Sequence, residues 1–279
     1  MWNKDLLTPF QLPNLNCKEF DLLMEKISYE NIKHYTKDDF VSKFEERIQQ
    51  YQYVSIKGLE NFKHKDLIIG CQHFIDNLLL EHNIKNLQIF EHDYNYYKRL
   101  KADIQYTTLD SLEKGKPLLI AMPFPGHLNV HNQFKDILQK CDDMEIDVHI
   151  DASWLPASFN IDYDISNKCV KSIAMSLSKA FYMGWNRIGL RWTKQYKEND
   201  SIAIMNRFNM IPAVLYKIGC LYLENYELDY IVKMYKKNYN ELCKNLKLRP
   251  SNIIHAAFSI DRSKLYGVKQ LLENSINPS

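Results

Sequence analysis

The stretch MSLSKAFYMGWNRIGLRW, at residues 175–192, is the most informative part of this chain. Ser176 and Ser178 precede Lys179, and Arg187 follows eight positions after the lysine. A lysine amine forms a Schiff base with an aldehyde where its pKa and placement suit the reaction. Hydroxyl groups and a guanidinium match the oxygen atoms of a phosphate. The stretch therefore predicts a site for a phosphorylated aldehyde. Taken one by one, the same residues also fit a solvated lysine after a strand and an arginine in an ordinary ion pair.

As a unit, these residues and the Arg187-Ile188-Gly189 that follows closely resemble the lysine segment of fold-type I pyridoxal-phosphate (PLP) enzymes, the aspartate aminotransferase superfamily. The resemblance is sharpest over residues 146–192. It implies that pyridoxal 5'-phosphate is the cofactor and that Lys179 carries it as a Schiff base and shuttles protons. It also implies that Ser176, Ser178 and Arg187 bind the cofactor phosphate.

Outward from this stretch, short apolar runs alternate with amphipathic segments of helical length over residues 51–200. This alternation predicts βα units and an α/β fold in which helices flank a mainly parallel sheet, as in PLP-dependent transferases of fold type I. Residues 1–50 are helical in pieces, and residues 201–279 are mostly helical. We therefore expect an N-terminal helical segment, a PLP-binding large domain over 51–200, and connecting helices with a reduced small C-terminal domain over 201–279.

The segment IDVHIDASW, residues 146–154, reads as a strand that ends at Asp151. A carboxylate in that position pairs with a pyridinium nitrogen and keeps it protonated, whereas the simpler interpretation is a cap of the following turn. The resemblance implies the first role. It also aligns Trp154 with a tyrosine that donates to the ring oxygen of PLP in the family, and an indole N–H is likewise a donor.

Two earlier segments have weaker patterns. In DLIIGCQHFIDNLL, residues 66–79, a strand runs through Gly70 into a helix, whose first N–H groups favour an anion. The family has a glycine-containing phosphate loop here, so the resemblance implies that Gly70, Cys71 and Gln72 contact the phosphate. In FEHDYNYYKRL, residues 90–100, it implies an aromatic ring stacked on PLP. Tyr94 is our candidate and Tyr96 its rival, and simple helix packing of these tyrosines is the alternative.

The turn AMPFPGHLNVHNQF, residues 121–134, departs from the family pattern, which places an asparagine against the ring oxygen of PLP. No asparagine occupies that place, and we expect His127, or else Asn129, to replace it. His127 and His131 are four residues apart and therefore also fit one helix face as metal ligands. A third ligand of suitable spacing is missing, so we predict no metal.

Composition limits the other classes of function. Lys plus Arg (36) nearly balances Asp plus Glu (34), which gives no electrostatic case for nucleic acid or a membrane surface. The six cysteines are dispersed without metal-finger spacing, a usage typical of reduced thiols. No apolar run approaches the ~20 residues of a membrane span. We expect a cytoplasmic protein without nucleic-acid or membrane partners.

The resemblance implies a PLP-dependent aminotransferase that acts on an amino acid or related primary amine, as a homodimer. A PLP-dependent decarboxylase or lyase begins in the same way, and a non-catalytic binding protein that keeps the fold is a further alternative. Family members carry an arginine for the substrate carboxylate in a fuller C-terminal domain. Only Arg249 and Arg262 lie late enough here, and neither stands in a recognisable motif.

Overall fold

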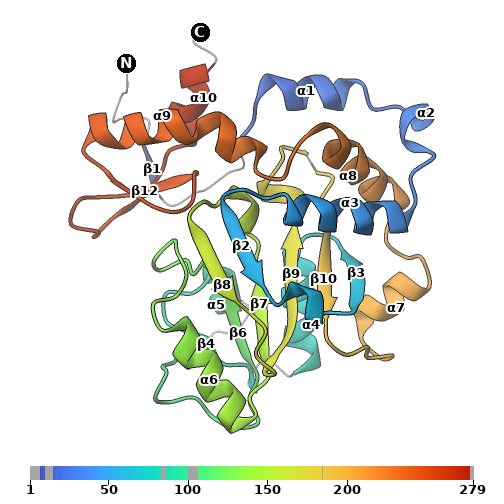
Figure 1. Ribbon diagram of the computed structural model, residues 1–279, viewed down its shortest axis with the longest axis vertical. Helices are drawn as coiled ribbons and strands as arrows, with labels where there is room; N and C mark the ends of the chain where they lie inside the picture. Colours follow the sequence, from blue (N-terminus) through green and yellow to red (C-terminus); the bar gives the residue numbers. More distant parts are fainter. Residues whose placement is uncertain (1–6, 10–14, 83–85, 100–105, 184, 277–279) are drawn as a thin grey trace.

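The computed structural model describes residues 7–9, 15–82, 86–99, 106–183 and 185–276. Gly184, which is part of the lysine segment, lies outside the described residues. At the centre is a five-stranded sheet (Figure 1) in which β6, β7 and β9 run parallel and β10 runs antiparallel to its two neighbours. Its strands, in spatial order, are β3 (His64–Ile68), β10 (Gly189–Thr193), β9 (Val170–Ser176), β7 (Val148–Asp151) and β6 (Leu118–Ala121). The predicted fold class is therefore confirmed: an α/β fold around a mainly parallel sheet.

Helices cover this sheet because each has one apolar face. The helix α6 (Phe134–Met144) connects β6 to β7 and buries Phe134, Ile137, Leu138 and Cys141, which recur at helical spacing. The helix α4 (Cys71–Glu81) follows β3 and buries Phe74, Ile75 and Leu78. A short helix, α5 (Asn95–Arg99), lies between β4 (Ile89–Phe90) and β5 (Tyr106–Thr107), which pair in parallel. A second parallel pair joins β2 (Val54–Lys57) to β8 (Ile161–Asp164).

The two ends of the chain pack against each other. The N-terminal helices are α1 (Lys18–Glu25), α2 (Tyr29–Ile32) and α3 (Lys37–Gln49). The later helices are α7 (Ser201–Arg207), α8 (Ala213–Asn225), α9 (Tyr230–Leu246) and α10 (Lys269–Ile276). Figure 1 shows α3 beside α8, and Lys43 on α3 forms an ion pair of 2.8 Å with Glu224 on α8. A helix from before residue 50 therefore packs against one from after residue 200.

A small antiparallel sheet lies beside α9. Its order is β1 (Thr8–Pro9), β13 (Leu265–Gly267), β12 (Ala256–Phe258) and β11 (Arg249–Pro250). In this mostly helical part of the chain, β12 forms within the apolar run NIIHAAFSI, residues 252–260. None of the helices in the described ranges is both long and apolar enough to cross a membrane.

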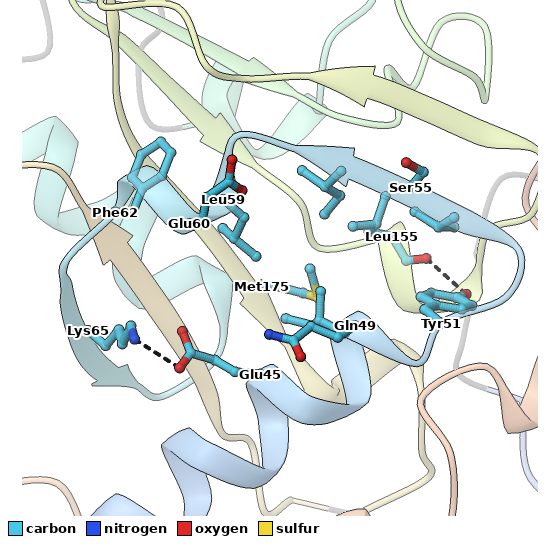
Figure 2. Close-up of a pocket in the computed structure, with 13 residues that line it drawn as sticks. Glu45, Gln49, Tyr51, Ser55, Leu59, Glu60, Phe62, Lys65, Leu155 and Met175 are labelled. Atoms are coloured by element: carbon cyan, nitrogen blue, oxygen red, sulfur yellow. Dashed lines mark hydrogen bonds and ion pairs between the residues drawn. The ribbon is translucent and has the colours of Figure 1, made fainter.

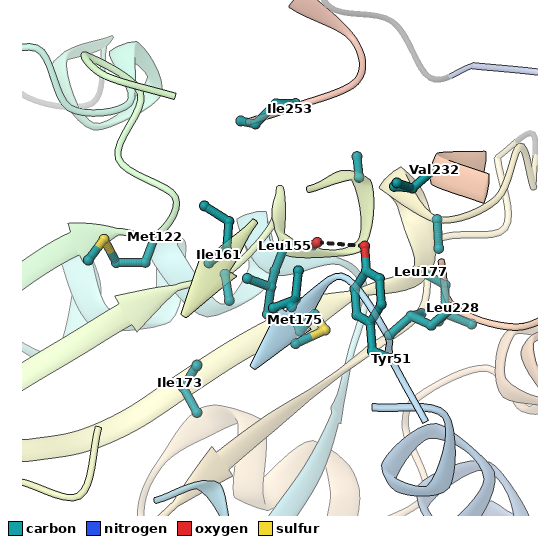
Figure 3. Packing of buried hydrophobic residues seen from close by; sticks show 14 of the residues in the cluster. Tyr51, Met122, Leu155, Ile161, Ile173, Met175, Leu177, Leu228, Val232 and Ile253 are labelled. Carbon is teal, nitrogen blue, oxygen red and sulfur yellow. Dashed lines mark hydrogen bonds between the residues drawn. The ribbon is translucent and has the colours of Figure 1, made fainter. Parts of the chain in front are cut away.

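The main core lies against the face of β9 that Met175 occupies. Figure 3 shows Met175 of β9 near Leu155, Tyr51 and Leu228, with Ile173 farther along the same strand. The Tyr51 hydroxyl donates to the carbonyl oxygen of Ser158 at 2.8 Å, so this buried phenol is satisfied. Because side chains alternate along a strand, Ser176 faces away from the side that Met175 occupies.

Candidate active site

A cavity of about 160 Å³ lies where the carboxyl ends of β7 and β9 meet the first turn of α4. Ligands of α/β folds bind at the carboxyl edge of the strands. The structure brings ten of the eleven residues predicted for the site to this cavity, namely Gly70, Cys71, Gln72, Tyr94, Asp151, Trp154, Ser176, Ser178, Lys179 and Arg187. The other lining residues are Ile75, Ala121, Pro125 and Ser153.

Lys179 ends a short 3₁₀ helix, η5 (Leu177–Lys179), which follows β9 directly. Its ammonium nitrogen lies 4.1 Å from the centroid of the Trp154 ring. Burial, and next the positive charges of Arg187 and Lys269, lower the pKa of Lys179 to about 8. At neutral pH a larger fraction of this lysine is therefore the neutral, nucleophilic amine than of an ordinary lysine.

Two side-chain donors of this segment, a hydroxyl and a guanidinium, line the cavity. The buried hydroxyl oxygen of Ser178 has no hydrogen-bond partner within the part of the chain that the structure describes. In the same ranges Arg187 forms no ion pair with a carboxylate. A buried polar group without a partner is costly, so a ligand is the expected source of the missing acceptor. A hydroxyl and a guanidinium at one cavity suit a phosphate.

The first turn of α4 adds backbone donors. Gly70, the residue before the helix, has φ 75° and ψ 164°, a conformation open almost only to glycine. A methyl group on Gly70 would lie 3.7 Å from Cβ of Arg187. Cys71 and Gln72 begin the helix at the cavity, and the first N–H groups of a helix lack acceptors within it. These N–H groups therefore join Ser178 and Arg187 as donors toward an anion.

Asp151 is the last residue of β7 and is buried. One carboxylate oxygen accepts a hydrogen bond from the Tyr97 hydroxyl at 3.1 Å, and the other accepts the Ser153 N–H at 3.0 Å and the Ser153 hydroxyl. Burial raises the pKa of Asp151, and these hydrogen bonds oppose that rise. The site therefore holds a buried carboxyl group whose charged form is opposed by burial and favoured by these donors.

Tyr97 and Ser153 were not predicted from the sequence as residues of the site. Tyr97 is 1% exposed and lies three residues after Tyr94, which directly precedes α5, and the two rings are 5.6 Å apart. The three-residue spacing was the available signal. Ser153 follows Asp151 by two residues, the position from which a backbone N–H commonly donates to an aspartate side chain.

The structure separates the two candidate tyrosines. Tyr94 lines the cavity. Tyr96 does not, because its hydroxyl accepts from the Gln72 side chain at 2.6 Å and donates to Asp76 at 2.9 Å on α4. One N–H of the Gln72 side chain is thereby donated to Tyr96.

His127 is the predicted site residue that the structure does not bring to the cavity. It is exposed, and its ring lies 5.4 Å from Phe124 and 5.6 Å from His131. Asn129, the other candidate, accepts a hydrogen bond from Asn252 at 3.1 Å. Of this turn, Ala121 and Pro125 line the cavity. In the described ranges, no group of three His, Cys, Asp or Glu side chains is arranged to hold a metal ion.

A larger cavity, of about 380 Å³, lies on the other side of β9 between α3, β2 and the sheet (Figure 2). Its floor includes Met175 and Leu155, and at its rim Lys65 forms an ion pair of 2.8 Å with Glu45. None of its lining side chains has a buried polar atom without a partner, as far as the structure describes them. Unlike the site of Lys179, this cavity presents no unsatisfied group that requires a ligand.

Comparison with known proteins identifies the fold. No family model matches this chain, and no curated protein is significantly similar to it in sequence. Among solved structures, an aspartate aminotransferase mutant from Thermus thermophilus superimposes with a TM-score of 0.61 at 12% identity, covering 91% of this chain and 82% of that one. An aminotransferase from Mycobacterium tuberculosis gives 0.63 at 12% identity over 90% and 73% of the two chains.

An L-threonine-O-3-phosphate decarboxylase from Porphyromonas gingivalis gives a TM-score of 0.56 at 11% identity, over 86% of this chain and 81% of that one. This chain therefore has the fold of the fold-type I aminotransferases. The resemblance inferred from the lysine segment is confirmed at the level of the fold.

Proposed function

We propose that this protein binds PLP covalently at Lys179 and acts as an aminotransferase on an amino acid or related primary amine. One observation carries the proposal: a lysine of lowered pKa, a buried carboxylate and an unsatisfied Ser178 hydroxyl line the same cavity. Perturbed titratable groups that converge in a pocket are typical of active sites. The fold of the solved aminotransferases supports the same conclusion.

The residues of the cavity match the parts of PLP. The Ser178 hydroxyl, the Arg187 guanidinium and the first N–H groups of α4 supply donors for its phosphate. Asp151 supplies the acceptor for a protonated pyridine nitrogen, and Tyr97 and Ser153 keep that carboxylate in place. When bound, PLP withdraws electrons from the bonds at the carbon that bears the substrate amine. Tyr94 offers a ring face at the same cavity.

Lys179 then has two tasks. As a neutral amine it is the nucleophile toward the aldehyde, and its pKa of about 8 allows that form near neutral pH. As a free amine, the same nitrogen would be a base within the cavity and could move a proton at the substrate carbon.

A PLP-dependent decarboxylase is the second candidate. The similarity in fold of this chain to the solved L-threonine-O-3-phosphate decarboxylase favours it. Neither Arg249 nor Arg262, the two late arginines, lines the cavity.

The proposal includes a homodimer in the cytoplasm. Trp185 is 94% exposed on the segment that joins Lys179 to Arg187, and Tyr182 on that segment and Ile69 beside Gly70 are also exposed. Large apolar side chains clustered at a site mark a surface that another chain covers. All six cysteines are buried free thiols, which suits a reducing compartment.

The first test is covalent capture of PLP followed by borohydride reduction and peptide mapping. We expect the reduced label on the peptide that contains Lys179 at one equivalent per chain, and an amino acid that is a substrate should prevent the reduction. Pyridoxal without phosphate is the control, and it should be captured far less well because Ser178 and Arg187 have no phosphate to bind. A label spread evenly over exposed lysines would contradict the proposal.

The rate of PLP capture should depend on pH in a way set by Lys179. Because the neutral amine is the nucleophile and its pKa is about 8, the rate should rise about tenfold per pH unit below pH 8 and level off above it. Stopped-flow absorbance between about pH 6 and pH 10 measures this profile. A rate that keeps rising to the pKa of an ordinary lysine would show that burial does not perturb Lys179.

A further inference from the structure

The Lys179 ammonium lies over the face of Trp154, at 4.1 Å from the ring centroid. A cation in this position is attracted by the negative face of the ring, and tryptophan is the best of the aromatic side chains for this contact. The contact is local to the site, because Trp154 and Lys179 both line the cavity. It differs from the role that the sequence suggested for Trp154, which was a donor to the cofactor.

Contacts with residues other than Lys179 hold Trp154 in place. Its carbonyl oxygen accepts hydrogen bonds from the Ala157 N–H at 3.0 Å and from the Ser158 hydroxyl at 2.7 Å. His255, from the segment before β12, packs on the indole with ring centroids 5.4 Å apart and planes at 78°, an edge-to-face contact. Trp154 and His255 are far apart in the sequence, so no local sequence pattern predicts this contact.

His255 supports the indole as a neutral ring. It is 1% exposed, and its Nε2 accepts the backbone N–H of Leu15 at 3.2 Å. Burial, and next the charge of Lys179, keep the pKa of His255 well below its usual value. Its Nδ1 is buried and has no hydrogen-bond partner among the described residues. Since Nε2 is the acceptor, Nδ1 carries the proton, and the ring has no charge that would repel the lysine.

The charges around Lys179 disfavour its ammonium form, and the contact with Trp154 opposes that effect. Arg187 and Lys269 both disfavour its ammonium form, as does burial. Asp151 lines the same cavity, but its oxygens accept from Tyr97 and Ser153. The face of Trp154 is therefore an attraction that acts on the ammonium without a formal charge.

We infer that Trp154 is a positioning residue for Lys179, which rests on the proposed function of this lysine. The ring face holds the ammonium in the cavity before any carbonyl reacts with it, and His255 fixes the plane of that ring. The C-terminal part of the chain thus acts on the lysine in two ways: His255 supports the ring that attracts the ammonium, and the charge of Lys269 opposes the ammonium form.

The experiment measures the pKa of Lys179 in the cofactor-free protein by competitive acetylation and peptide mass spectrometry between about pH 6 and pH 10. It compares the wild type with Trp154→Phe and Trp154→Met. Phenylalanine keeps a ring with a weaker face, and methionine has similar bulk without one. We expect the pKa to fall in the order Trp, Phe, Met, with Met below Phe by about 0.5 to 1.5. Exposed Lys57 is the internal reference.

The support by His255 is tested in both backgrounds. His255→Leu should lower the pKa of Lys179 in the wild type and leave it unchanged in Trp154→Met, because no ring remains to be fixed. Equal pKa values in wild type, Trp154→Phe and Trp154→Met would overturn the role of the ring. An equal effect of His255→Leu in the two backgrounds would overturn its action through Trp154. Since the wild type and Trp154→Phe already differ in ring strength, the comparison stands even if Trp154→Met does not fold.

The labelling requires no PLP, so its result is separate from that of the proposed function. A protein that captured no PLP would still show the order of pKa values if Trp154 holds the ammonium. Conversely, PLP capture at Lys179 with no dependence of its pKa on Trp154 would leave the proposed function intact and overturn only this inference.

Discussion

The Lys179→Met variant is expected to lose covalent capture of PLP completely and, near pH 7, to be more stable than the wild type. Methionine has nearly the length of lysine but no amine, so borohydride reduction should leave no label on this peptide. A gain of stability on removal of a functional group is typical of a site whose strain serves activity.

The gain follows from the lowered pKa. The pKa of Lys179 falls from the usual 10.5 to about 8 on folding, so the folded state binds this proton less tightly than the unfolded chain does. Below pH 8 the buried ammonium therefore lowers the stability of the folded state by roughly 1 to 3 kcal/mol. Partial exposure of the lysine and its contact with Trp154 both reduce this cost. The cost declines between pH 8 and pH 10.5, since the lysine becomes neutral in both states.

Urea unfolding of both proteins at several pH values measures this difference. The free energies of unfolding should differ most below pH 8 and converge at high pH. Lys171→Met is the matched control, because Lys171 lies on β9 as well but is partly exposed in an ion pair of 3.4 Å with Asp147. It should keep PLP capture and show no gain of stability. A Lys179→Met variant less stable than the wild type at pH 7 would show that the lysine is not strained.

The Gly189→Ala variant is expected to lose at least about 3 kcal/mol of stability, or not to fold. A methyl group on Gly189 would lie 2.3 Å from the carbonyl oxygen of Met175 and 2.7 Å from Cα of Ser176. Both are backbone atoms of β9, to which β10 is paired at this position, so no side chain can move aside. The strands must separate, and Ser176 and η5 would shift with them.

Gly115→Ala provides the control for this substitution. Gly115 has φ 81° and no atom within 4 Å of an added methyl group, so only the backbone conformation opposes the change, at about 1 to 2 kcal/mol. Denaturant unfolding should therefore rank the two variants with Gly189→Ala much the less stable. Equal losses would mean that β9 and β10 separate easily, and the steric argument would be wrong.

Much of the fold could be predicted from local sequence. The alternation of apolar runs with amphipathic segments fixes α4, α6 and the strands between them, because helix and strand bury their apolar residues at different periods. The spacing of Ser176, Ser178, Lys179 and Arg187 is likewise local. A strand end, a short turn and the return strand β10 bring these residues to one cavity without help from distant segments. The place of Asp151 in the site could be predicted in the same way, since it ends a strand that runs parallel to β9.

The remaining features depend on contacts between residues far apart in the chain. Tyr97 donates a hydrogen bond to Asp151, which lies 54 positions later in the sequence. His255 contacts Trp154 because the C-terminal part of the chain packs near this site. His127 faces away because its turn closes on Phe124 and His131. By itself, the sequence determined the α/β fold and the lysine segment, since both follow from short-range periodicity and spacing. Only the tertiary structure decided which side chains fix Asp151 and Trp154, because burial and pairing depend on neighbours that no local pattern specifies.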